Sequence, residues 1–216
     1  MNRLEGRKSK IGTIIYNHII NNKREYLIVS ILFFIGLIIS VIFVNNTNEN
    51  TLNDISDYIT DLVNKVKTYE SVDLLKLLKN SIIYNTLITL LLWFGASTII
   101  GIPIVYGTIV FKGFSVGYTI SSLIAVLGIG NGILIAMSFM LLHNAIFIPT
   151  MIAICVSGVK LYKSIMKNKQ RENIKLEILR HTIFCLIMLI SMVLSSIVEI
   201  YLSTNISVIL LKNIKI

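Results

Sequence analysis

Long apolar runs, each able to cross a lipid bilayer, limit what this chain can fold into. They occupy residues 26–44, 81–159 and 182–202. A bilayer core of roughly 30 Å takes about 20 apolar residues per transmembrane helix. With 55% of its residues hydrophobic and 14% charged, the chain lies outside the composition of soluble domains. We therefore predict an all-α integral membrane protein whose first run is a retained membrane anchor.

Clustered cations predict the orientation of the chain in the membrane. Residues 1–25 hold six Lys or Arg against two acidic residues, and residues 160–180 hold seven against two. Residues 45–80 instead hold six acidic residues against four lysines. Because short cytoplasmic segments carry an excess of Lys and Arg, we place the leader 1–25 and the loop 160–181 in the cytoplasm and 45–80 outside. The basic segments favour anionic lipid as a partner over nucleic acid.

Lys112 is the only charged residue between Lys79 and Lys160. A lysine at the centre of a span costs about 2.5 to 3.5 kcal/mol on insertion scales, a cost that a cytoplasmic turn avoids. We therefore predict that Lys112 lies at such a turn and that the GIGNG stretch forms an outer turn. The predicted spans within the long run are then 82–111, 114–127 and 133–159.

With 26–44 and 182–202, this register gives five spans. The amino terminus is then cytoplasmic and the tail 203–216 lies outside, although two lysines in the tail weaken the second assignment. In a competing register the second span ends at Gly101, and Lys112 lies inside the bundle as a buried functional charge.

The outer segment 45–80 predicts an amphipathic helix. Apolar residues recur in it at alternating intervals of three and four, which aligns them on one face. This stripe could pack on the membrane surface or on the outer ends of the spans, or it could dock an extracytoplasmic partner. The stripe, which is our candidate partner surface, consists of Leu52, Ile55, Ile59, Leu62, Val66 and Tyr69.

The leader predicts a basic interfacial helix on an anionic leaflet, because its isoleucines share one face with lysines nearby. We interpret His18 on that face as an interfacial polar residue and not as a ligand.

Few residues have side chains that could take part in catalysis or bind a ligand. His143 and Asn144 lie near the middle of the fourth predicted span, whereas Glu199 lies near the outer end of the last. Because a catalytic constellation must meet at one depth, we expect no catalytic residues. We also expect no cofactor, no metal site and no small-molecule substrate, and we interpret Cys155 and Cys185 as packing residues. Glu199 is either a functional carboxylate or a side chain that reaches the outer interface.

Two features of the apolar runs predict helix packing. Gly113 and Gly117 have the small-xxx-small spacing that lets two helices approach closely. Pro149 should bend the fourth span, since it frees a backbone carbonyl.

Three stretches resemble a known family when they are taken in order: GIPIVYGTIVFKGFSVGYTISSLI, HNAIFIPTMI and SSIVEIYLS. They are similar to the corresponding stretches of stage II sporulation protein M, and the resemblance covers most of the chain. One departure is His143, where related sequences tend to have glutamine.

The resemblance implies a non-enzymatic membrane scaffold that acts in forespore engulfment, at the sporulation septum and the engulfing mother-cell membrane. It implies stage II sporulation proteins D and P, which degrade peptidoglycan, as partners. On this reading the outer helix recruits them, while Gly113, Gly117, Asn144, Pro149 and Glu199 preserve the bundle. The alternative is a transporter or permease subunit, suggested by Lys112, His143 and Glu199 as polar groups within the membrane.

Overall fold

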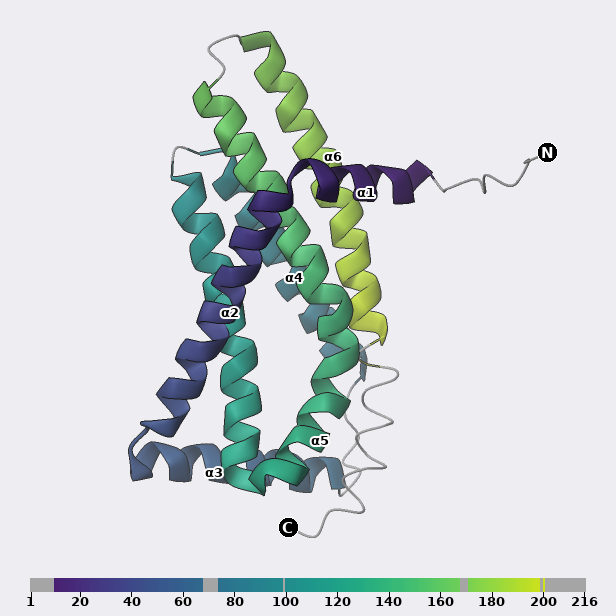
Figure 1. Ribbon diagram of the computed structural model, residues 1–216. Coiled ribbons are helices and arrows are strands. Elements are labelled where there is room, and N and C mark those ends of the chain that lie inside the picture. The colour runs from purple at the N-terminus through teal and green to yellow at the C-terminus, as the bar shows by residue number, and fades with distance from the viewer. Residues whose placement is uncertain (1–9, 68–73, 99, 168–170, 199, 201–216) are drawn as a thin grey trace, which may run out of the picture.

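The computed structural model describes residues 10–67, 74–98, 100–167, 171–198 and 200. Within these ranges the chain is helical and contains no strand (Figure 1). The helices are α1 (Lys10–Asn21), α2 (Lys23–Asn45), α3 (Glu49–Lys67), α4 (Leu74–Ala96), α5 (Gly101–Lys167) and α6 (Arg171–Val198). Five segments are long and apolar enough to cross a membrane: Lys23–Asn45, Leu75–Ala96, Gly101–Ser138, His143–Met166 and Ile174–Val198. The prediction of an all-α membrane protein with five spans is confirmed.

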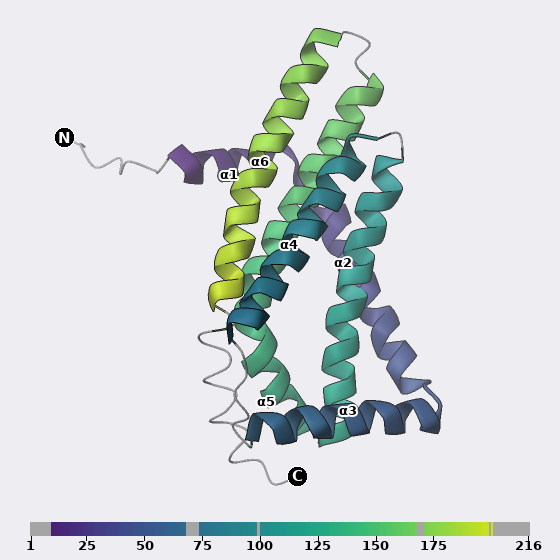
Figure 2. The same ribbon diagram turned by 180° about the vertical axis from the view of Figure 1, so that it is seen from behind.

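The bundle has two chemically different ends. α1 and the tips of α5 and α6 lie toward one end, whereas α3 lies flat across the other end (Figures 1 and 2). We call these the basic end and the α3 end. The predicted loop 160–181 is largely helical, because α5 continues to Lys167 and α6 begins at Arg171. Lys163 Nζ lies 2.8 Å from Glu25 Oε1, which ties the tip of α5 to the start of α2.

α5 folds back on itself at Gly128. This residue has φ 79° and ψ 165°, which is the only non-helical backbone conformation inside α5. Such a pair of angles is essentially restricted to glycine. It divides α5 into a first leg, residues 101–127, and a second leg, residues 129–167. The bend at Gly128 lies at the α3 end (Figure 1), within the predicted GIGNG turn.

The predicted register of the second and third spans is wrong. α4 ends at Ala96, and a short turn leads to Gly101, so the spans 82–111 and 114–127 do not form as predicted. Lys112 lies within the first leg and not at a turn. The competing register, in which the second span ends at Gly101, is closer to the structure, where α4 ends at Ala96.

Local hydrogen bonds explain why the chain turns before Gly101. Ser97 Oγ donates to the carbonyl of Trp93 at 3.1 Å, and Thr98 Oγ1 donates to the carbonyl of Gly95 at 2.8 Å. The carbonyl of Gly95 also accepts the backbone N–H of Thr98 at 3.1 Å, as where the last turn of a helix tightens. Pro103 then lies in the first turn of α5, where its missing N–H removes no helical hydrogen bond.

The closest helix contact joins α2 to the first leg of α5. A Cβ on Gly36 would meet the carbonyl oxygen of Val110, and a Cβ on Gly113 would meet that of Phe33. A Cβ on Gly117 would meet Ser40 Oγ. The two helices therefore pack backbone against backbone, as small residues permit in membranes.

α1 is held against the bundle by His18. Its Nδ1 lies 3.0 Å from the hydroxyl of Tyr26, and its ring stacks on Phe184 with 4.5 Å between centroids. Asn22 Nδ2 donates to the carbonyl of His18 at 2.7 Å. Burial, and then the positive charge of Lys160, lower the pKa of His18. The docked form of α1 therefore favours the neutral imidazole.

We predict that Gly113→Ala destabilises the folded chain by about 1 to 3 kcal/mol, the usual cost of overpacking a filled interface. Denaturant unfolding in detergent micelles measures this free energy. Gly107→Ala is the matched control on the same leg, because a Cβ there would meet no atom within 4 Å. Equal stability of the two variants would contradict the packing described.

We predict that α1 docking weakens as pH falls. Since docking lowers the pKa of His18, its stability is fully present above the ordinary histidine pKa of about 6.5 and is lost below that value. An environment-sensitive fluorophore on a cysteine at Asn17, which is exposed, reports docking. His18→Phe retains a ring for stacking and should remove the pH dependence; an unchanged pH profile would refute the role of His18.

Candidate functional site

α3 covers the ends of both legs of α5 and is anchored there by its apolar stripe. Ile59 is 7% exposed and forms a buried cluster with Ile135. Partly buried side chains pack around this pair: Ile55, Leu123, Val126 and Leu127. This contact holds α3 flat against the end of the bundle.

The candidate partner surface predicted from the sequence is therefore not an open surface at Ile59. Ile55 and Leu52 are half-buried. The side chains of Leu62 and Val66, and the whole of Tyr69, lie outside the described residues. The part of the stripe that the structure describes, Ile55 and Ile59, packs on the legs of α5 near their bend.

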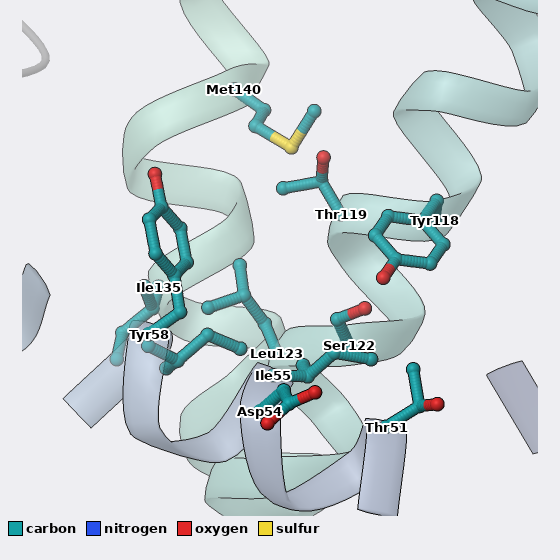
Figure 3. Close-up of a pocket in the computed structure, with 11 residues that line it drawn as sticks. Thr51, Asp54, Ile55, Tyr58, Tyr118, Thr119, Ser122, Leu123, Ile135 and Met140 are labelled. Carbon is teal, nitrogen blue, oxygen red and sulfur yellow. The ribbon is translucent and has the colours of Figure 1, made fainter. Parts of the chain in front are cut away.

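The opposite face of α3 is polar and exposed. Asp57 and Asp61 lie on it and are exposed. Tyr58, although 69% exposed, instead extends from α3 toward the legs of α5 and lines a cavity there (Figure 3). Exposed carboxylates can meet a basic partner surface. The amphipathic pattern implied this polar face, but the sequence analysis assigned the partner surface to the apolar stripe.

A cavity of about 530 Å³ lies between α3 and the two legs of α5 (Figure 3). The volume is within the range of small-molecule binding sites. Its walls are mainly apolar, with hydroxyl groups and one carboxylate among them. The lining residues are Thr51, Asp54, Ile55, Tyr58, Ile59, Tyr118, Thr119, Ser122, Leu123, Ile135 and Met140.

A second polar site lies within the bundle and contains Lys112. Its Nζ is 4.4 Å from the centroid of the Phe147 ring and 5.4 Å from that of Tyr84. Aromatic faces attract a cation electrostatically, and more strongly where water is excluded. This contact offsets part of the insertion cost on which the prediction of a cytoplasmic turn rested, and it gives a physical reason for the position of Lys112 inside the bundle.

His143 contacts the same aromatic ring. It stacks on Phe147 with 4.9 Å between centroids, and its Nδ1 lies 3.0 Å from Ser195 Oγ. Ser195 Oγ also lies 2.9 Å from the carbonyl oxygen of His143, to which it can donate. The structure thus gathers Lys112 and His143 around Phe147, and it joins the second leg of α5 to α6.

Polar side chains also join α4 to α6. Asn85, which is 1% exposed, donates from Nδ2 to Ser196 Oγ at 2.7 Å. Ser81 Oγ donates to the same hydroxyl at 2.9 Å. Hydrogen bonds of this kind hold membrane helices together. Sequence reasoning missed this contact, although an asparagine inside an apolar run was a signal for it.

The other predicted site residues are dispersed. Asn144 is half-buried, and Pro149 is exposed in the second leg, where the backbone remains helical. Gly113 and Gly117 lie in the contact with α2. Glu199 lies outside the described residues.

The described part of the chain contains no group of three or more His, Cys, Asp or Glu side chains that could hold a metal ion. Cys155 and Cys185 are both buried and form no disulfide. Cys185 Sγ lies 3.5 Å from His181 Nε2, and His181 Nδ1 lies 2.8 Å from Ser157 Oγ. These contacts link α6 to the second leg of α5 near the basic end.

Comparisons with known proteins identify the family. The family model for stage II sporulation protein M matches residues 29–204. No curated protein and no solved structure matches the chain. The matched residues include all three stretches whose resemblance was noted in the sequence. With five helical segments able to cross a membrane, the chain belongs to the stage II sporulation protein M family and is a sporulation-related, multi-pass membrane protein.

Proposed function

We propose that the chain is a non-enzymatic scaffold that holds peptidoglycan-degrading proteins at the septal and engulfing membrane during forespore engulfment. The observation that carries this proposal is the position of α3. The helix lies flat across the bundle end opposite the basic segments, and its apolar side is anchored on α5. Its polar side is thereby presented to whatever lies beyond the membrane.

The charge distribution supports an orientation for this scaffold. α1 and the basic hairpin formed by α5 and α6 lie toward one end of the bundle, which favours the cytoplasmic side. α3 then faces the space that contains the cell wall. Anionic headgroups of the inner leaflet would attract the basic end.

We propose stage II sporulation proteins D and P as the partners, as the family resemblance implies. The partner surface is no longer the apolar stripe as a whole. It is the exposed polar face that contains Asp57 and Asp61. Complementary charge across an interface contributes specificity and speeds association.

We predict that a photoreactive residue at Asp57 crosslinks a peptidoglycan-degrading protein in sporulating cells, whereas one at Ile59 does not. Asp57 is exposed on the polar face of α3, whereas Ile59 is 7% exposed and packs on α5. Mass spectrometry of the purified adducts identifies the partner. Adducts at Ile59 alone, or none with a wall-degrading protein at Asp57, would contradict the proposal.

Transport is the second candidate function, and the site around Phe147 favours it. Lys112 and His143 meet there inside the bundle, and polar groups within membrane spans are features of ion pathways. Transport requires a continuous path across the membrane, however, whereas a structural cation requires only local contacts that stabilise its charge.

We predict that vesicles containing the full chain show the same proton flux as protein-free vesicles. A pH-sensitive dye trapped inside the vesicles measures this flux. A flux that depends on the protein and disappears in Lys112→Met would favour transport over scaffolding. His18→Phe, at the basic end, is the control variant that should leave any such flux unchanged.

A further inference from the structure

The cavity beneath α3 has a defined depth in the membrane. It lies between the two legs of α5, just inside the bend at Gly128, and α3 closes its outer end (Figures 1 and 3). Both legs belong to segments that can cross the membrane. The cavity therefore lies at the outer edge of the hydrocarbon layer, where lipid tails join their headgroups.

Ser122 indicates which chemical group an occupant of this cavity should carry. The residue is 4% exposed, it lines the cavity, and its Oγ has no hydrogen-bond partner in the part of the chain that the structure describes. Several helical hydroxyls donate to a carbonyl four residues earlier, as Thr119 does to Ser115 at 3.0 Å and Ser138 does to Leu134 at 2.6 Å. A buried polar atom without a partner is costly in a membrane, and it calls for an explanation. An acceptor that enters the cavity would supply one.

The mouth of the cavity has a different polarity from its walls. Asp54 and Tyr58 are exposed residues of α3 that line it, and Thr51 lies beside them. Leu123, Ile135 and other apolar side chains line the interior (Figure 3). A carboxylate at the mouth disfavours an anionic headgroup and attracts an ammonium group. The occupant should therefore have an apolar tail, a carbonyl at the boundary and a positively charged end.

We propose that this cavity binds a glycerophospholipid whose headgroup contains an amine. One acyl chain fills the space between the legs of α5, the ester carbonyl accepts a hydrogen bond from Ser122 Oγ, and the ammonium group lies near Asp54. The lipid thereby becomes part of the support beneath α3. This proposal is independent of the scaffold function, because it concerns what fills the bundle and not what binds its outer face.

A photoreactive phosphatidylethanolamine with the reactive group in its acyl chain tests the proposal. The full chain is reconstituted in bilayers with this probe, irradiated, and mapped by mass spectrometry. We expect labelling to concentrate on the residues that line the cavity. Labelling spread evenly over the lipid-facing sides of all five predicted spans would overturn the proposal.

Two variants of lining residues and one control variant test occupancy. Thr119→Trp should fill the cavity and abolish the concentrated labelling, whereas Ala125→Trp should not, because Ala125 is exposed on the same leg but does not line the cavity. Ser122→Ala should reduce labelling about threefold to tenfold through the loss of one hydrogen bond. If Thr119→Trp does not fold, the smaller Ser122→Ala change still decides, and unchanged labelling in that variant would overturn the role of Ser122.

A third variant tests the headgroup. Wild-type chain should prefer phosphatidylethanolamine over phosphatidylglycerol probes, and Asp54→Asn should remove the preference. Equal labelling by both probes in the wild type would overturn the headgroup assignment. A photoreactive residue at Thr119 that captures a protein in sporulating cells, and no lipid, would show that a partner protein fills the cavity and would overturn the lipid assignment altogether.

Discussion

The backbone contact between α2 and the first leg of α5 is the constraint on which the rest of the bundle depends. Gly36 and Gly113 allow each helix to lie against the carbonyl groups of the other. The hydrophobic effect does not drive helices together within lipid, because lipid tails are as apolar as the side chains. Close packing and hydrogen bonds must therefore stabilise the association of the helices. The second leg and α6 pack beside the first leg, which is fixed against α2. α3 packs on the legs of α5 near their bend.

Polar contacts complete the assembly where glycine packing does not reach. Asn85 and Ser196 join α4 to α6, and Ser195 joins α6 to His143 of the second leg. Lys112 is accommodated among aromatic rings at a similar level of the bundle. These polar pairs lie beside a buried apolar core that includes Leu92, Ile109 and Phe147, and many other large apolar side chains are exposed on the outside of the bundle.

The sequence predicted the number of spans and the turn in the GIGNG stretch, because the first depends on run length and the second on a glycine cluster. It misplaced the turn between the second and third spans. That prediction included the cost of burying Lys112 but not the attraction of its ammonium group to the rings of Tyr84 and Phe147. Those rings come from distant parts of the chain. The direction of the α3 stripe could not be settled either, since periodicity defines a face without naming its neighbour. Ile135, which buries Ile59, is a contact that only the folded chain reveals.

The bend at Gly128 has a consequence for chirality. A Cβ at this position would meet no atom within 4 Å, so lack of space does not explain the glycine. Its φ of 79° and ψ of 165° are instead the mirror image of nearly extended backbone, which L-residues adopt readily only with the opposite sign of φ. A D-alanine introduced by chemical synthesis would suit position 128, whereas its L-enantiomer, identical in size, would oppose the reversal of the chain. Position 128 therefore requires a residue that can adopt a positive φ, and not simply a small residue.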